Sequence, residues 1–154
     1  MKILTCLLLM GASAMSLQTA PAIAAPHASA ADARAMLERA VARLNSVGAD
    51  KALSEFNQNT GPFNTGELYV FVFNLKGIYE AYGAHPGLVG NDVSDLKDAV
   101  GKPIVRDMIE IAKASGRGRI NYVWLNRADN RIEHKLSLIE LVGDHVVGVG
   151  YYPG

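Results

Sequence analysis

Cysteine is almost absent from this sequence of 154 residues, in which Cys6 is the only one. Cys6 lies in a segment that begins with the basic Lys2, continues through the apolar run 3–10 and then holds mostly small residues. This pattern is typical of a secretory signal peptide, so we expect residues 1–24 to be removed together with Cys6, with Ala30 as the alternative last residue. The exported chain would then have no disulfide and would depend on buried apolar side chains for its stability.

Long hydrophobic runs are also missing. The apolar part of the first segment is too short to span a bilayer, and no later segment is apolar enough to do so. We therefore expect no stable membrane insertion and a periplasmic or secreted location. Positive charge shows no excess, because 15 Lys and Arg residues balance 15 Asp and Glu residues. Nucleic acid is not expected as a partner, since its binding needs a basic patch.

Motifs of the common enzyme classes are absent as well. The exported chain has no usable cysteine nucleophile, no nucleophile elbow and no glycine-rich phosphate loop before a helix. Asp92, Asp95 and Asp98 lack the spacing and the final glutamate of a calcium loop, so capping and turns explain them better. His134 and His145 have no third metal ligand at a useful spacing. We therefore expect no enzyme, no metal site and no cofactor.

What the sequence does contain is a change from helical to strand periodicity. Apolar residues recur at helical spacing in the first part of the exported chain, whereas alternation places Tyr69, Phe71 and Phe73 on one face of a strand. The expected elements are helices over 32–47, 50–56 and 102–115, strands over 68–75, 78–82, 118–125, 132–142 and 145–152, and loops over 57–66 and 85–101. This order predicts an α+β fold with one antiparallel sheet, in a single domain over 31–154.

An ordered set of motifs resembles the single Cache domain and covers nearly all of the predicted domain. The set includes Tyr69-Val70-Phe71-Val72-Phe73, His85-Pro86, Gly101-Lys102-Pro103, Tyr122-x-Trp124, Lys135 and Gly148-Val149-Gly150-Tyr151. The resemblance implies a PAS-like fold with a central five-stranded sheet. It places a long N-terminal helix on one face, and a helix and a long loop over the face that holds the ligand. Members usually form the extracytoplasmic sensing part of chemoreceptors and histidine kinases, and they bind small metabolites that are often carboxylates.

Two features depart from the pattern of the family. Receptors continue past this domain into a transmembrane helix, whereas this chain ends at Gly154, so we expect a solo domain that reports to a separate membrane receptor or histidine kinase. The family also often has a tyrosine three residues after its lysine, and Leu138 stands there in this chain. Loss of that polar contact predicts a more apolar ligand, or a pocket without a strong ligand.

Two basic side chains are candidate ligand contacts. Pro86 restricts the backbone of His85 to an extended conformation, which orients the ring either toward a ligand at the pocket mouth or toward nearby backbone. Lys135 lies in an otherwise apolar strand, where it either reaches solvent or, on the covered face, needs an anionic partner.

Aromatic and apolar side chains would supply the walls of the pocket, unless they simply fill the core. The candidates are Tyr69, Phe71, Met108, Tyr122 and Trp124. Gly148 and Gly150 alternate along the last strand, which implies a close approach of the first helix or of the ligand.

Together these features predict a ligand-binding sensor module for chemotaxis or related signal transduction, with a small and anionic ligand. The alternative is a protein-interaction or structural domain whose pocket is vestigial and filled by side chains.

Overall fold

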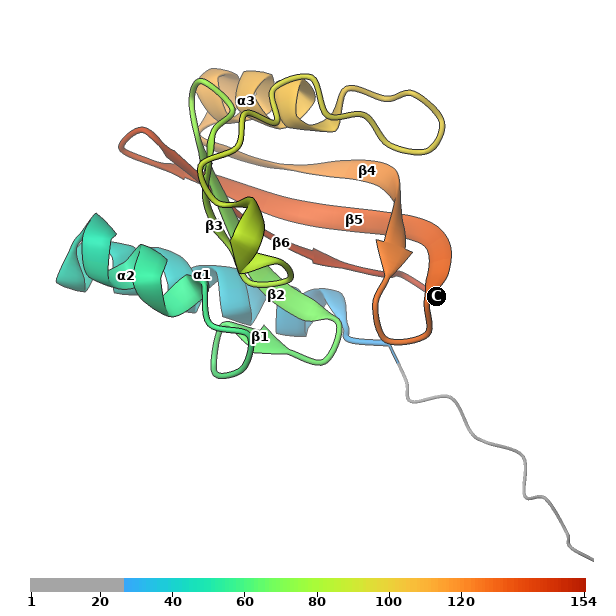
Figure 1. Cartoon of the computed structure of the whole chain (residues 1–154), viewed down its shortest axis with the longest axis horizontal. Coiled ribbons are helices and arrows are strands. Elements are labelled where there is room, and N and C mark those ends of the chain that lie inside the picture. Colours follow the sequence, from blue (N-terminus) through green and yellow to red (C-terminus); the bar gives the residue numbers. More distant parts are fainter. Residues whose placement is uncertain (1–26) are drawn as a thin grey trace, which may run out of the picture.

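The computed structural model describes residues 27–154, and the predicted signal peptide lies outside this range. An antiparallel sheet forms the centre of the molecule, with strands in the order β1-β2-β6-β5-β4 and β3 paired to β2 (Figure 1). The strands are β1 (Asn64–Thr65), β2 (Leu68–Asn74), β3 (Tyr79–Tyr82), β4 (Arg117–Asn126), β5 (Arg131–Val142) and β6 (His145–Tyr151). The predicted α+β class and the five predicted strands are confirmed, and β1 adds a two-residue strand inside the predicted loop 57–66.

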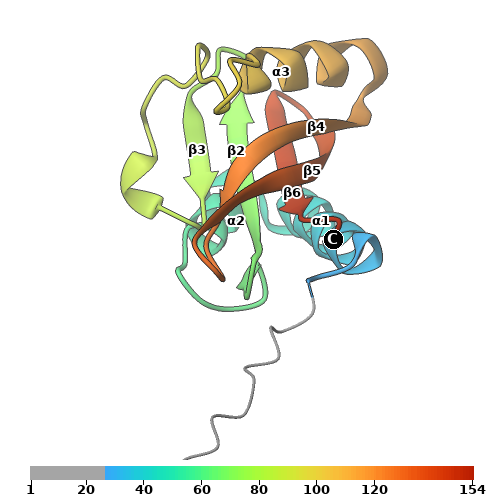
Figure 2. The same cartoon turned by 90° about the vertical axis from the view of Figure 1, so that its right-hand side faces the viewer.

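Helices cover both faces of the sheet (Figures 1 and 2). α1 (Ala30–Val47) and α2 (Ala49–Phe56) pack on one face, while α3 (Ile104–Ser115) packs on the other. α1 begins two residues before the predicted start, because Ser29 and Asp32 form a capping box that satisfies free backbone N–H groups. α3 begins two residues later than predicted, because Pro103, at ψ 78°, lies outside the helix.

The alternation of each strand divides the interior into two apolar layers. On β2, Val70 and Val72 face α1, whereas Tyr69, Phe71 and Phe73 face α3. β6 contributes to both layers in the same way, with Val147 and Val149 toward α1. Because both faces of the sheet are covered, both sets of side chains are apolar, as the sequence predicts.

The long loop between β3 and α3, predicted over 85–101, is ordered by backbone contacts. It contains the 3₁₀ helix η1 (Pro86–Leu88), and the Gly90 N–H donates to the Tyr79 carbonyl at 2.8 Å. The Asp98 carboxylate accepts hydrogen bonds from the backbone N–H groups of Val100, Lys102 and Val123. Asp92 and Asp98 therefore accept backbone hydrogen bonds in turns, as predicted, whereas Asp95 forms an ion pair with Arg106 at 2.7 Å. Residues 27–154 contain no cluster of three or more potential metal ligands.

Candidate functional site

A small cavity lies between the sheet and α3, and we call it the inner cavity. Its walls are largely aromatic rings, and its free volume of about 20 Å³ leaves room for about one water molecule. The lining residues are Tyr69, Phe71, Phe73, Tyr79, Tyr82, Ile104, Val105, Met108, Tyr122 and Trp124. Five of the seven residues predicted to bind ligand therefore surround one cavity.

Two wall residues, Tyr79 and Tyr82, escaped prediction because β3 is irregular. Strict alternation would put residues three positions apart on opposite faces of a strand. In β3, however, Phe73 pairs with Tyr79 and Val72 with Ala81, so one extra residue is inserted between them. The bulge brings both tyrosine rings to the inner cavity, where they stack 4.8 Å apart at an angle of 5°.

Lys135 lies on the same face of the sheet and is 0% exposed. Its Nζ donates to the hydroxyl oxygens of Tyr69 at 2.8 Å and Tyr152 at 3.4 Å. Within residues 27–154, no carboxylate forms an ion pair with it. Burial lowers the pKa of Lys135 to about 7, although the negative charge of Glu67 acts in the opposite direction.

Lys135 reaches the inner cavity through Tyr69. The ring of Tyr69 lines the cavity, while its hydroxyl group accepts the hydrogen bond from Nζ. Nζ also lies 4.2 Å from the centroid of this ring. Burial raises the pKa of Tyr69 well above its ordinary value, so the hydroxyl keeps its own proton at neutral pH and can donate it to an anion.

Two glycines of β6 make room for these side chains. A side chain at Gly148 would collide with the ring of Phe71, and one at Gly150 would collide with Lys135 and Ser137. The close approach inferred from the sequence is present, but the prediction of its partner was wrong. Side chains from neighbouring strands fill the space, rather than α1 or a ligand.

Leu138 faces the opposite side of the sheet from Lys135 and packs against the layer that contains α1. The two positions are three steps apart along the strand, and each step reverses the face. The interpretation of Leu138 as a lost ligand contact was therefore wrong, because a tyrosine at this position would not point to the inner cavity.

The structure places His85 outside the inner cavity. Its backbone is extended, at φ −148°, and η1 begins at the next residue. The side chain lies beside an open depression, which we call the outer cleft, of about 740 Å³. The outer cleft is lined by Asn59, residues 84–88 and Arg127. His85 touches the wall of the inner cavity only from outside, with its ring centroid 5.7 Å from that of Tyr82.

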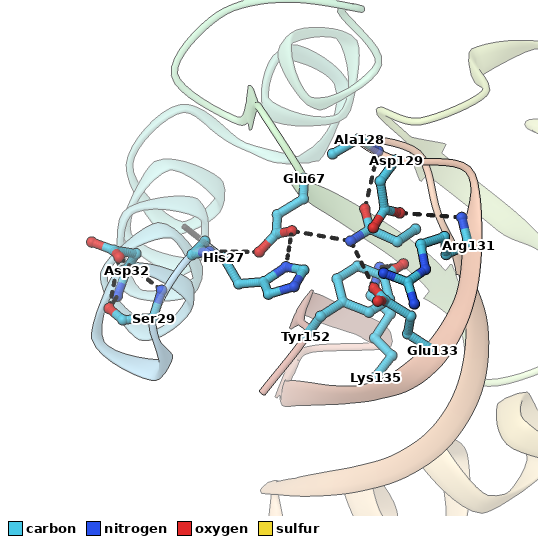
Figure 3. Close-up of polar contacts among 12 residues, drawn as sticks. His27, Ser29, Asp32, Glu67, Ala128, Asp129, Arg131, Glu133, Lys135 and Tyr152 are labelled. Carbon is cyan, nitrogen blue, oxygen red and sulfur yellow. Dashed lines mark hydrogen bonds and ion pairs between the residues drawn. The ribbon is translucent and has the colours of Figure 1, made fainter. Parts of the chain in front are cut away.

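A polar network joins the start of the described chain to the end of the sheet that carries Lys135 (Figure 3). The Glu67 carboxylate accepts hydrogen bonds from His27 Nδ1 at 3.0 Å, from the Ala28 N–H at 2.5 Å and from Asn126 Nδ2 at 3.3 Å. The hydrogen bond that His27 donates to Glu67 raises the pKa of His27. Sequence reasoning missed this network because Glu67 adjoins a predicted loop and its partners lie 39 to 59 residues away in the chain.

A family model described as a Cache domain matches residues 35–152. The chain belongs to the Cache domain family. The resemblance inferred from the sequence motifs is thereby confirmed, and this Cache domain is a binding domain rather than an enzyme. Within residues 27–154, no helix is both long and apolar enough to cross a bilayer.

Solved structures of chemoreceptor sensor domains share the fold of this Cache domain. The crystal structure of a methyl-accepting chemotaxis protein from Vibrio parahaemolyticus RIMD 2210633 aligns with a TM-score of 0.66 and 21% identity, over 79% of this chain and 86% of that chain. A structure described as the basis for carboxylic acid recognition by a Cache chemosensory domain aligns with a TM-score of 0.66 and 22% identity, over 80% and 92% of the two chains. The periplasmic sensor domain of a chemotaxis protein aligns with a TM-score of 0.62 and 24% identity, over 79% and 88%.

Proposed function

We propose that this Cache domain is an exported sensor module that binds a small carboxylate at the inner cavity and reports its presence to a separate membrane receptor or histidine kinase. The observation that carries the proposal is the buried amine of Lys135, which has two tyrosine hydroxyl groups as partners but no carboxylate. The similarity to a Cache chemosensory domain described by its carboxylic acid recognition supports the same ligand class.

Within residues 27–154, the amine of Lys135 has no carboxylate as a counter-ion. An ammonium group in a low-dielectric interior is stable only when an anion or several strong hydrogen bonds compensate the lost hydration. A carboxylate that accepts hydrogen bonds from Tyr69 and from Lys135 Nζ would supply that compensation, and charge-assisted hydrogen bonds are the stronger kind. The aromatic walls would pack on the few carbon atoms of the ligand.

Binding requires the cavity to widen, because about 20 Å³ is too little for even acetate. The rings of Tyr69 and Tyr82 lie 5.5 Å apart and can move only together with their neighbours. Such a movement would alter the packing of β2 against β3 and thereby change the shape of the domain. A ligand-dependent change of this kind is what a sensor module needs in order to inform its partner.

The small volume of the inner cavity also favours the second candidate function, a protein-interaction or structural domain whose pocket is filled by its own side chains. A thermal shift assay with acetate, lactate and pyruvate separates the two functions. The sensor proposal predicts that at least one of these compounds raises the melting temperature of the wild type and of Lys51→Met. Lys51 is an exposed lysine of α2 and serves as the control.

The Lys135→Met variant should lose this response. A flat response of the wild type to all three compounds would support the second function instead.

A further inference from the structure

The outer cleft contains a cation that the proposed binding site does not use. Arg127 lies in the turn between β4 and β5, opposite residues 84–88 of the loop after β3. Its side chain is exposed, and it forms no ion pair within residues 27–154. An arginine stays charged at every physiological pH, so the outer cleft carries a permanent positive charge.

The inner cavity and the outer cleft are separated by two tyrosine rings. The guanidinium carbon of Arg127 lies 5.4 Å from the centroid of the Tyr69 ring, while Lys135 Nζ lies 4.2 Å from the same centroid. Tyr82 forms the second part of the wall, because it lines the inner cavity and also contacts the ring of His85. Each ring therefore touches one side chain of the outer cleft and belongs to the wall of the inner cavity.

The two cations would attract a carboxylate in sequence. The outer cleft is open and roomy, whereas the inner cavity is small. A planar guanidinium group suits a carboxylate because it can donate two parallel hydrogen bonds to it. In the cleft, the side chains of Asn59 and His85 can add further donors.

We propose that the outer cleft is an anion-capture site, in which Arg127 receives the carboxylate before Tyr69 and Tyr82 part and admit it to the inner cavity. This inference rests on the proposed function, since it assigns the entrance of the same site. A charged entrance raises the rate of association and has less effect on the rate of dissociation, and salt screens it.

The experiment uses acetate as the probe and two readouts that report separately on the cavity and the cleft. Trp124 is the only tryptophan of the chain and lines the inner cavity, so its fluorescence and its indole N–H resonance report on the cavity. The Nε–H resonance of Arg127 reports on the outer cleft. Arg131→Gln serves as the control for Arg127→Gln. It also removes one positive charge, from an exposed residue that lies four positions after Arg127 in the chain.

We expect acetate to shift both resonances in the wild type. Arg127→Gln should lower the association rate constant measured by stopped-flow about three- to tenfold at low salt, with a smaller difference at high salt. Arg131→Gln should stay within about twofold of the wild type. The inference is overturned if Trp124 responds while Arg127 does not, if the two variants slow binding equally, or if neither resonance shifts. A shift of Arg127 alone would show that acetate stops at the outer cleft, which overturns its passage to the inner cavity and the proposed function with it.

Discussion

Replacement of Lys135 by methionine should stabilise the folded domain in mildly acidic solution. Burial lowers the pKa of this lysine from an ordinary 10.5 to about 7, because the folded state disfavours the charged amine. A difference of this size corresponds to roughly 5 kcal/mol of unfavourable free energy when the amine is protonated in both states. Methionine has a similar length and no charge, so it removes this cost.

The gain is smaller than the full electrostatic cost, because the variant also loses the hydrogen bonds from Nζ to Tyr69 and Tyr152. Each hydrogen bond contributes about 1 kcal/mol, so a net stabilisation of about 1–3 kcal/mol is expected at pH 5.5. For a domain of this size, that corresponds to an increase in melting temperature of roughly 4–10 °C.

The advantage of the variant should shrink as the pH rises. Below about pH 7 the lysine is protonated in both the folded and the unfolded state, so the free-energy cost of burying its charge does not change with pH. Between about 7 and 10.5 the unfolded chain binds more protons than the folded one, so this group makes the wild type more stable as the pH increases. Melting by circular dichroism at pH 5.5, 7 and 9 measures this trend, with Lys51→Met as the exposed control. If Lys135→Met has a lower melting temperature than the wild type at pH 5.5, the folded protein compensates the charge of the buried amine, and the inferred cost of burial is wrong.

Three further substitutions test the packing that positions the site, each by thermal or chemical denaturation. Gly148→Val forces a branched side chain against Phe71 and should cost about 1–3 kcal/mol or more, whereas an unchanged midpoint would mean that this side of β6 is open. Asp98→Ala removes the acceptor of three backbone N–H groups and should cost about 2–4 kcal/mol, and a loss below about 1 kcal/mol would contradict the role given to it. Ser29→Ala removes the cap of α1 and should cost about 1 kcal/mol, while Ser29→Asp, which keeps a capping oxygen, should cost much less.

Much of the fold follows from periodicity in the sequence. Alternation along β2 correctly places Tyr69 and Phe71 on one face and Val70 on the other, because each face packs against its own helices. The family resemblance, confirmed by the match over 35–152, contributes the arrangement of the layers. It also led to the choice of Lys135, whose burial no local pattern in the chain reveals.

The parts that could not be predicted depend on irregular or distant contacts. The bulge in β3 brings Tyr79 and Tyr82 to the inner cavity, and a single inserted residue leaves no distinct signal in the sequence. Arg127 reaches the ring of Tyr69 across 58 positions of the chain, and a turn arginine ordinarily points to solvent. His85 and Lys135 were expected to share one pocket, but the Tyr69 and Tyr82 rings separate their surroundings.

The number of protons taken up when a carboxylate binds tests the role of Lys135 most directly. Isothermal titration calorimetry at pH 8, in two buffers with different ionisation enthalpies, gives this number for acetate, lactate or pyruvate. In the free protein the amine of Lys135, with a pKa of about 7, is mostly neutral at pH 8. If Lys135 receives the ligand, binding takes up most of one proton at pH 8, much less at pH 6 and none in Lys135→Met. Binding without proton uptake at pH 8, or with equal uptake in Lys135→Met, would contradict the claim that Lys135 receives the ligand.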